Sequence, residues 1–376
     1  MMIPFNKATL AGNEFVYIAD AIQRGHISGD GQYTRKCHRF LENLLKSPRV
    51  LLTTSCTHAL EMAAILLDLQ EGDEILLPSY TFVSTANAFI LHKARPTFVD
   101  IREDTLNIDE RLIERQLSDK TKAIVVVHYA GIGCEMDPIL EMGRKRSIPI
   151  IEDNAHGLFG SYKSRLLGTL GTFAGLSFHE TKNITCGEGG AFIINDAAFT
   201  ERAEIIREKG TNRSRFFRGE VDKYSWMDVG SSYLPSDILA AFLLAQLEDW
   251  EHIQRRRQEI WHFYYGALAS WAEKNGVKRP FIPSHCGPSY HLFHLVMPTP
   301  TSRDFLIREL KDKGIMSIFH YLPLHLSKMG ARFGFKPGDC PVTERISESL
   351  VRLPFHNSLK NEELETIVET INRLRL

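Results

Sequence analysis

The sequence predicts an α/β protein with a large domain, built on a mixed and mainly parallel β-sheet covered by helices, and a smaller C-terminal α/β domain. Between residues 50 and 195, short apolar or β-branched runs alternate with segments of helical periodicity. This alternation predicts strands joined by crossover helices on both faces of one sheet. The chain has 376 residues, 43% hydrophobic and 24% charged, which indicates a globular protein with more than one domain.

The first segment, residues 1–30, is expected to be an arm that contains one helix (14–24) and a glycine-rich turn (28–31). The alternating region follows it. Its expected strands are 50–54, 74–77, 96–99, 124–127, 150–151 and 191–195, and its expected helices are 57–69, 84–91, 136–146 and 199–209. Residues 210–232 are polar, aromatic and glycine-bearing, so we expect a long functional loop there.

A second set of elements follows a long helix expected at 236–263, in which the arginines at 255–257 are expected to form a solvated face. Strands are expected at 291–296 and 315–319, and helices at 302–313 and 361–374. We therefore divide the chain into a large domain, residues 1–250 with the arm, and a small domain, residues 251–376.

The charge balance argues against several kinds of partner. Lys and Arg number 45 against 46 Asp and Glu, a net charge of -1, so neither nucleic acid nor an anionic membrane is expected. No apolar run approaches the roughly 18 residues of a membrane helix, and the N-terminus lacks the apolar core of a signal peptide. The six cysteines show no CxxC pair and no Cys/His ligand spacing. We expect a cytoplasmic protein with reduced thiols and no metal site.

An aspartate and a lysine carry the clearest chemical signal. Asp153 ends the apolar run that begins at Pro149, as expected at the carboxyl edge of a buried parallel strand. Lys182 lies in SFHETKN, shortly before the glycine-rich GEGG. Pyridoxal phosphate (PLP) needs an amine that forms a Schiff base and a carboxylate that keeps its ring nitrogen protonated. We therefore predict a PLP site in which partial desolvation lowers the pKa of Lys182.

Each of these two residues also has a simpler interpretation. Asp153 could cap a helix or belong to a metal site, and Glu152 could compete for its role. Strand alternation, however, is expected to direct Glu152 to the opposite face of the sheet. A single lysine in a loop is usually solvated, so only the motifs around Lys182 support its assignment as the residue that binds the cofactor.

Three further stretches suit the rest of such a cofactor. Residues 55–59 join a strand to a helix, where Thr57 and backbone N–H groups would bind a phosphate, unless Thr57 only caps the helix. No GxGxxG follows this strand, which argues against a nicotinamide enzyme. Ser177 and His179 alternate along a predicted strand and would reach the same phosphate. The aromatic Tyr80 and Phe82 would stack on a flat ring, with core packing as the alternative.

Taken together, these motifs resemble a known family. They are SCTHAL (55–60), PSYTFVST (78–85), PIIEDNAH (149–156), SFHETKN (177–183) and GEGG (187–190). The set is similar to the PLP-dependent sugar aminotransferases of fold type I, which act on nucleotide-linked keto sugars, and the similarity extends to HYLPLH at 320–325. The resemblance implies the fold-type I transferase architecture, PLP as cofactor, and a homodimer or higher homo-oligomer. Its implied small-molecule substrates are a dTDP-linked keto sugar and L-glutamate.

The resemblance also implies roles for individual residues. Lys182 would hold the cofactor and then move protons, and Asp153 would pair with the ring nitrogen. His156 and Phe82 would lie against opposite faces of the ring. The implied phosphate ligands are Thr57, the backbone of the neighbouring Cys56 and His58, Ser177 and His179.

The remaining implied contacts concern the substrate and a partner subunit. Many relatives carry an asparagine where Ser232 stands, and that residue reaches the phosphate bound by the partner; a serine would do so with a shorter side chain. Tyr321 and His325 are expected to contact the sugar or nucleotide. Arg213 and Arg218 are expected to bind the diphosphate.

Several functions remain open at this point. Some relatives carry a histidine at the lysine position and act as dehydratases, so the presence of Lys182 favours a transaminase. The alternatives are a 3- or 4-aminotransferase for another nucleotide-linked keto sugar, a regulator that binds PLP without turnover, and a nucleotide-sugar-binding scaffold without PLP.

Overall fold

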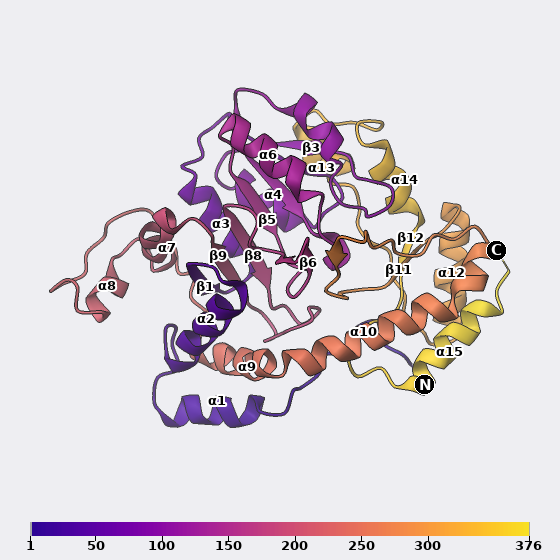
Figure 1. Ribbon diagram of the computed structural model, residues 1–376, viewed down its shortest axis with the longest axis horizontal. Helices are drawn as coiled ribbons and strands as arrows, with labels where there is room; N and C mark the ends of the chain where they lie inside the picture. Colours follow the sequence, from indigo (N-terminus) through magenta and orange to yellow (C-terminus); the bar gives the residue numbers. More distant parts are fainter. Residues whose placement is uncertain (1, 376) are drawn as a thin grey trace.

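Seven strands form the central sheet of the protein, which we describe from a computed structural model over residues 2–375 (Figure 1). Their order across the sheet is β1-β9-β8-β5-β4-β2-β3. They are β1 (Arg49–Thr53), β2 (Glu74–Pro78), β3 (Arg95–Val99), β4 (Thr121–Val127), β5 (Ile150–Asp153), β8 (Phe173–Ser177) and β9 (Gly190–Ile194). Only β9 runs antiparallel to its two neighbours, β1 and β8. The predicted mixed, mainly parallel sheet is confirmed.

Different helices cover the two faces of this sheet. They are α1 (Glu14–Gln23), α2 (Gln32–Leu45), α3 (Cys56–Leu66), α4 (Val83–Ile90), α6 (Met136–Arg146), α7 (Thr200–Arg207) and α9 (Asp237–Glu248). Leu51 of β1 points into a core with α3, α4 and α7, whereas its neighbours Val50 and Leu52 point to a core with α1, α2 and α9. α6 continues this second core over β2, β4 and β5. Because both faces are buried, the strands are mainly apolar, and their polar residues lie mostly at the strand ends.

Helix α2 is absent from the sequence-based expectation, and its N-terminus shows why. The N-cap residue is Gly31, which has no side chain to satisfy the first N–H groups of the helix. The buried carboxylate of Asp237, at the start of α9, accepts hydrogen bonds from the backbone N–H groups of Tyr33 and Thr34 at 3.1 and 2.8 Å. A Cβ atom at position 31 would lie 2.3 Å from Asp237 Cγ, so only glycine fits. The cap therefore comes from a residue about 200 positions away.

The long helix expected at 236–263 is two helices. α9 ends at Glu248, Asp249 departs from helical geometry, and α10 (Trp250–Ala267) follows. The expected solvated arginine face is wrong for Arg257, which is 3% exposed. Its guanidinium donates to the carbonyl oxygens of Tyr290 and His291, so it joins α10 to the loop that leads into the C-terminal part of the chain.

A separate hydrophobic core lies at the far end of α10. It contains residues between 260 and 371, together with Ile3 of the N-terminal arm. Helices α10, α12 (Pro300–Asp312) and α15 (Asn361–Asn372) surround the two-stranded sheet of β11 (His294–Val296) and β12 (Leu350–Arg352) (Figure 1). Residues 324 and 340, in contrast, pack into the core of the large sheet. The division of the chain at residue 250 stays a prediction.

The expected strand at 315–319 is wrong. Residues 315 and 318 form only isolated bridges, to Ile3 and to Arg352, because β12 occupies the place beside β11. The shorter elements are α5 (Glu110–Ile113), α8 (Arg213–Phe217), α11 (Ala269–Lys274), α13 (Lys328–Arg332), α14 (Pro341–Ser349), β6 (Ser161–Tyr162), β7 (Arg165–Leu166) and β10 (Cys286–Gly287). One-turn 3₁₀ helices lie at Glu114–Gln116, Tyr129–Gly131, Ala197–Phe199 and Leu324–Leu326.

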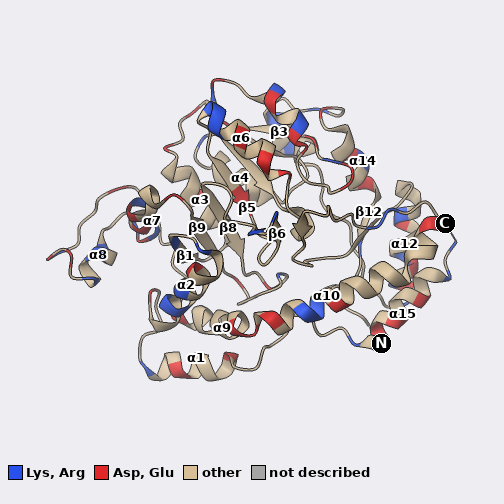
Figure 2. Ribbon diagram, viewed as in Figure 1, with Lys and Arg blue, Asp and Glu red and all other residues tan. Residues whose placement is uncertain are grey.

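The outer helices α10 and α12 carry both acidic and basic residues, whereas the charged residues of α15 are all acidic (Figure 2). Among residues 2–375, no helix combines the length and hydrophobicity that crossing a bilayer requires.

We expect Asp237→Ala to lower the free energy of unfolding by about 2–4 kcal/mol, because two buried N–H groups at the start of α2 would lose their acceptor. Denaturation by urea, followed by circular dichroism, would measure this loss. The matched control is Asp119→Ala on the exposed surface, expected within about 0.5 kcal/mol of the wild type. Equal stability of the two variants would show that α2 does not depend on this cap.

Candidate active site

A cavity of about 680 Å³ opens where β5 and β8 end and where α3 and α4 begin. In a mainly parallel sheet this edge is the usual place for a ligand. Segments of the C-terminal part of the chain, around residues 291–292, 318–321 and 352, form the opposite wall. Phe5 and Asn6 of the N-terminal arm close one side. The cavity therefore gathers residues from distant parts of the sequence.

Lys182 lies in the turn that follows β8, and its backbone N–H donates to the carbonyl oxygen of His179 at 2.9 Å. Its side chain lines the cavity. Burial lowers the pKa of Lys182 to about 8; the positive charge of Arg352 acts in the same direction, and the negative charge of Asp153 opposes it. The amine is therefore unprotonated near neutral pH far more often than an ordinary lysine, and in that form it can act as a nucleophile.

Asp153, the last residue of β5, is buried at the wall of the same cavity. Its Oδ2 accepts a hydrogen bond from Thr85 Oγ1 at 2.6 Å, and its Oδ1 accepts one from the backbone N–H of Ala155 at 3.2 Å. No lysine, arginine or histidine of residues 2–375 forms an ion pair with it. A buried carboxylate without a cationic partner is costly, so this side chain suits a positively charged group of a ligand.

The competing Glu152 points to the opposite face of β5, as strand alternation predicts. Its carboxylate is fully buried and accepts hydrogen bonds from His128 Nε2 at 2.8 Å and from the backbone N–H groups of residues 168, 170 and 171. These contacts use both oxygens, and Glu152 does not line the cavity.

Aromatic rings flank the space between Asp153 and Lys182. His156 stacks on His291 with ring centroids 4.1 Å apart, and its Nε2 lies 3.4 Å from Tyr321 Oη. Burial holds the pKa of His156 well below its usual range, so the ring is neutral. Phe82 precedes α4 and is 56% exposed at the cavity, whereas Tyr80 is buried in the core. Of the two predicted aromatic residues, only Phe82 is available to a ligand.

The start of α3 supplies the predicted phosphate donors only in part. Cys56 and Thr57 line the cavity in the first turn of the helix. The cap is Ser55, whose Oγ accepts the backbone N–H of His58 at 3.1 Å. The side chain of His58 turns away to bond Thr54 and to pack against Tyr233, and His58 does not line the cavity. Its backbone N–H, the group predicted to bind the phosphate, donates to Ser55.

Glycine at position 190 permits the close approach of β9 to this helix start. A Cβ atom at Gly190 would lie 2.3–2.5 Å from backbone atoms of Ser55 and Cys56. The second glycine of GEGG, Gly189, belongs to the cavity wall. The GEGG motif therefore allows the backbone of β9 to contact the backbone at the start of α3.

Ser177 ends β8, and His179 lies two residues beyond it, not on the strand as predicted. Both nevertheless line the cavity. His179 Nδ1 lies 2.9 Å from Thr181 Oγ1, and its Nε2 is 3.6 Å from the Glu188 carboxylate. The hydroxyl of Ser177 and the imidazole of His179 lie on the same side of the cavity as the start of α3, because β8 and α3 pack together.

Four predicted residues lie elsewhere. His325 is 0% exposed and bonds Ser79 Oγ at 2.6 Å and Glu344 Oε1 at 2.9 Å, so the expected substrate contact is corrected to a structural role between the two parts of the chain. Ser232, Arg213 and Arg218 line a different depression of about 790 Å³. The two arginines bond Glu208 and Glu204 there. Within a single chain, none of these three reaches the cavity.

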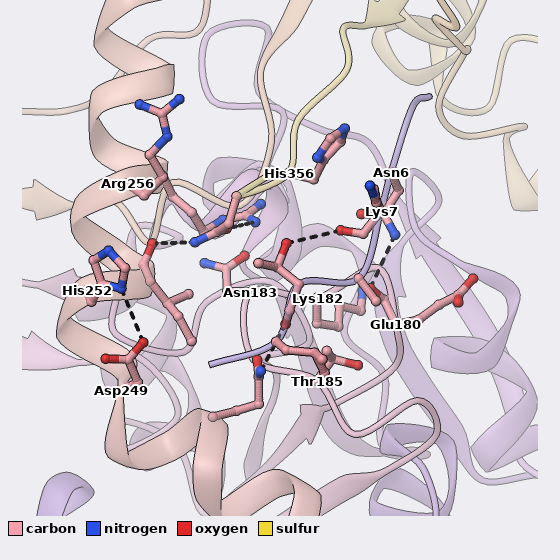
Figure 3. Close-up of a pocket in the computed structure, with 17 residues that line it drawn as sticks. Asn6, Lys7, Glu180, Lys182, Asn183, Thr185, Asp249, His252, Arg256 and His356 are labelled. Atoms are coloured by element: carbon pink, nitrogen blue, oxygen red, sulfur yellow. Dashed lines mark hydrogen bonds and ion pairs between the residues drawn. The ribbon is translucent and has the colours of Figure 1, made fainter. Parts of the chain in front are cut away.

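A smaller pocket of about 300 Å³ lies behind the lysine turn, between the N-terminal arm and α10 (Figure 3). Asn6 of the arm donates to the carbonyl oxygen of Glu180 at 3.2 Å, and Lys182 and Asn183 line the pocket beside them. The arm therefore supports the turn that carries the lysine.

Sequence reasoning missed several residues of the main cavity, among them Thr85, His291, His320 and Arg352. Thr85 and His320 lie within the motifs PSYTFVST and HYLPLH, which were selected for other residues, so the signal was present there. His291 and Arg352 come from segments without a recognisable motif, and only packing brings them to the cavity.

These residues fit PLP. The amine of Lys182 and the unpaired carboxylate of Asp153 face one cavity, with a neutral histidine and an exposed phenylalanine beside them. Hydroxyl and backbone donors of Thr57 and Ser177 suit the phosphate. Among residues 2–375, no three His, Cys, Asp or Glu side chains are grouped to hold a metal ion.

Comparisons with known proteins agree with this site. Residues 9–372 match the DegT/DnrJ/EryC1/StrS aminotransferase family, whose aminotransferases depend on PLP. The uncharacterized protein MJ1066 of Methanocaldococcus jannaschii is 33% identical over 351 residues, 92% of this chain and 90% of that protein.

Two solved structures extend the similarity to the fold. The aminotransferase TlmJ from Streptoalloteichus hindustanus has a TM-score of 0.91 at 29% identity, over 99% of this chain and 98% of that chain. The PLP form of Spr1654 from Streptococcus pneumoniae also has a TM-score of 0.91, at 27% identity over 99% and 98% of the two chains.

The lowered pKa of Lys182 gives a pH-dependent prediction. Since only the unprotonated amine adds to PLP, the rate of cofactor uptake by the apoprotein should rise with pH and level off above about 8, instead of 10.5 for an ordinary lysine. Stopped-flow absorbance would follow the bound cofactor, with Nα-acetyl-lysine as the control for ionisation of PLP itself. Asp153→Asn should shift the midpoint down, because the carboxylate raises this pKa. A midpoint near 10.5 would contradict the prediction.

Proposed function

The chain belongs to the DegT/DnrJ/EryC1/StrS family of PLP-dependent sugar aminotransferases, and from that premise we propose its substrates. It transfers an amino group from L-glutamate to C4 of dTDP-4-keto-6-deoxy-D-glucose. The product is dTDP-4-amino-4,6-dideoxy-D-galactose, the aminated sugar of the enterobacterial common antigen. The facing pair of Lys182 and unpaired Asp153 in one cavity is the observation that supports transamination.

The substrate assignment rests on sequence. The stretches REKGTNRSRFFRGEVDKYSW (207–226) and DVGSSYLPSD (228–237) resemble dTDP-4-amino-4,6-dideoxygalactose transaminase. The alternative substrate is another nucleotide-linked keto sugar aminated at C3 or C4, which the same catalytic groups would serve. The presence of both Lys182 and Asp153 argues against a non-catalytic regulator or scaffold. We place the enzyme in the cytoplasm, where sugar nucleotides are made.

PLP, when bound, supplies an aldehyde that takes up the amino group and a ring that withdraws electrons from the carbon losing its proton. The residues of this chain then have distinct tasks. Asp153 would keep the ring nitrogen protonated, since the carboxylate has no other cationic partner among the described residues. The amine of Lys182 would remove the proton from the donor's Cα and, in the second half of the reaction, deliver a proton to the sugar carbon.

The surrounding residues orient and dehydrate the reacting groups. Thr57 and Ser177 hold the phosphate end, and Phe82 and His156 confine the ring. His156 stays neutral, so it does not compete with Lys182 for the proton. Tyr321 lies within 3.4 Å of His156 and is the sugar contact best placed at the reacting end of the cavity.

We further propose that the active site is completed by a second copy of the chain. Residues 210–232 extend away from the body with α8 at the edge of the molecule (Figure 1). Their large apolar side chains, such as Phe217, Trp226 and Met227, are exposed, with Trp226 at 81%. Such a surface is unusual in a monomer and suits a partner subunit. Ser232, Arg213 and Arg218 would then reach the partner's phosphate and substrate.

The reaction product tests the substrate assignment. We expect purified protein with PLP, L-glutamate and dTDP-4-keto-6-deoxy-D-glucose to yield the galacto amine, because a lysine on one face of the cofactor delivers its proton to one face of C4. Proton NMR should show a small H3–H4 coupling, since an axial amine leaves H4 equatorial. The Lys182→Ala variant is the control and should give no product. A large H3–H4 coupling, or nitrogen bonded to C3, would be consistent with transamination but would contradict the proposed substrate and product.

Subunit mixing tests the shared site. Lys182→Ala and an Arg213→Ala, Arg218→Ala double variant should each be inactive alone, because each lacks one half of every site. Their mixture should recover up to about a quarter of wild-type activity, since half of the chains pair as heterodimers and each heterodimer keeps one intact site. Native mass spectrometry would confirm subunit exchange. Exchange without recovery of activity would mean that each chain builds its own site.

A further inference from the structure

Arg352 is a residue of the cavity wall to which the proposed mechanism gives no task. It ends β12, where it is paired with His294 of β11. On its other side its N–H donates to the carbonyl oxygen of Ile318 at 2.7 Å, and its own carbonyl oxygen accepts the N–H of Ile318 at 3.2 Å. Its backbone is therefore held from both sides, and its side chain lines the cavity that contains Lys182 and Asp153.

The guanidinium group of Arg352 has no polar partner within residues 2–375. Its side chain makes no hydrogen bond and no ion pair there, and its Nε is buried without an acceptor. The guanidinium lies over the ring of Phe5, whose centroid is 4.7 Å from Cζ. Burial lowers the pKa of Arg352, yet an arginine remains charged at neutral pH. A buried guanidinium with open N–H donors favours an anionic ligand.

The groups around Arg352 supply no such anion. Burial holds the pKa of His291, His294 and His320 well below the usual range, so these neighbours are neutral. The tyrosines beside it, Tyr129 and Tyr321, have pKa values raised by burial and are also uncharged. Apart from Lys182, Arg352 is the only Lys or Arg that lines the cavity among the described residues.

The position of Arg352 limits which anion it can serve. Arg352 and the reacting amine of Lys182 line the same cavity, and the charge of Arg352 helps to lower the pKa of Lys182. The α-carboxylate of an amino acid is bonded to the carbon that reacts there. The diphosphate of a sugar nucleotide is separated from C4 by the hexose ring. The phosphate of PLP belongs to a different wall, formed by the start of α3 and the end of β8.

We propose that Arg352 binds the α-carboxylate of the amino donor and thereby selects α-amino acids as donors. The inference rests on the proposed transamination, and it adds the residue that recognises the donor. A guanidinium offers two parallel N–H groups to the two oxygens of a carboxylate, and such a pair orients the bonds at Cα as well as binding them. Phe5 and the strand pairing of β12 hold the side chain ready for this contact.

The test uses the holoenzyme and only the first half-reaction, so it needs no sugar. Stopped-flow absorbance would follow the cofactor with L-glutamate, with its α-carboxamide (isoglutamine) and with L-glutamine, which lacks only the γ-carboxylate. For the wild type we expect kcat/KM to fall roughly 100-fold with the α-carboxamide, as expected when a desolvated charge loses its partner. Arg352→Gln should lose a similar factor with L-glutamate and should no longer distinguish it from the α-carboxamide. Arg352→Lys should recover part of the loss.

A binding measurement separates recognition from catalysis. 2-Methyl-L-glutamate has no α-proton and cannot be transaminated, so the spectral change on its addition reports affinity alone. Its dissociation constant should rise roughly 100-fold in Arg352→Gln, whereas affinity for PLP and KM for the keto sugar should stay within a few-fold of the wild type. Arg373→Gln, at the exposed end of α15, is the matched control and should change neither.

Four outcomes would overturn the proposal. If Arg352→Gln keeps the wild-type affinity for 2-methyl-L-glutamate and still distinguishes L-glutamate from its α-carboxamide, Arg352 does not bind the donor. If the wild type discriminates against L-glutamine and not against the α-carboxamide, and Arg352→Gln loses that preference, Arg352 binds the γ-carboxylate instead. If Arg352→Gln weakens only the binding of the keto sugar or of PLP, Arg352 binds a phosphate group. Should Arg352→Gln not fold, equal wild-type rates with L-glutamate and its α-carboxamide would also refute the assignment. A wild type that reacts with no amino acid removes the proposed function itself.

Discussion

Two opposite charges face one cavity in this protein without neutralising each other. Asp153 is buried and has a hydroxyl, a backbone N–H and the Cys56 thiol as partners, but no cation among residues 2–375. Burial lowers the pKa of Lys182 to about 8. Each group alone would be costly to bury. The arrangement is favourable only when a ligand brings a cation to the carboxylate and an electrophile to the amine, and PLP carries both. The remaining structure can be understood as the support for this pair.

The large sheet positions the two residues by strand register. Asp153 ends β5 and Lys182 follows the end of the adjacent strand β8, so both reach the carboxyl edge of the sheet. Alternation along β5 sends Glu152 to the other face, where four donors satisfy it completely. The absence of a side chain at Gly190 lets the strand beside β8 meet the start of α3, which places Thr57 at the cavity.

The second part of the chain completes the cavity and determines its electrostatics. Its histidines are neutral because they are buried, so the permanent charge on that wall is Arg352. The N-terminal arm joins both parts: Ile3 enters the C-terminal core, Phe5 packs on Arg352, and Asn6 holds the turn of the lysine. Recognition of the donor and positioning of the lysine thus depend on the same short segment of arm.

The sequence by itself determined the sheet, and it singled out the lysine, the aspartate and the helix start that the structure brings to one cavity. These features arise from local patterns: apolar runs that end in an acid, and motifs in which neighbouring residues act together. Only the tertiary structure decided the features that depend on distant residues. Helix α2 is capped by Asp237 from the other end of the domain, β12 displaces the expected strand at 315–319, and His325 is satisfied by Ser79 and Glu344, not by a ligand. Arg352 stands in no motif. Its proposed role follows from the absence of a counter-charge around it among residues 2–375. A missing partner can be recognised only when the neighbours have been brought together in space.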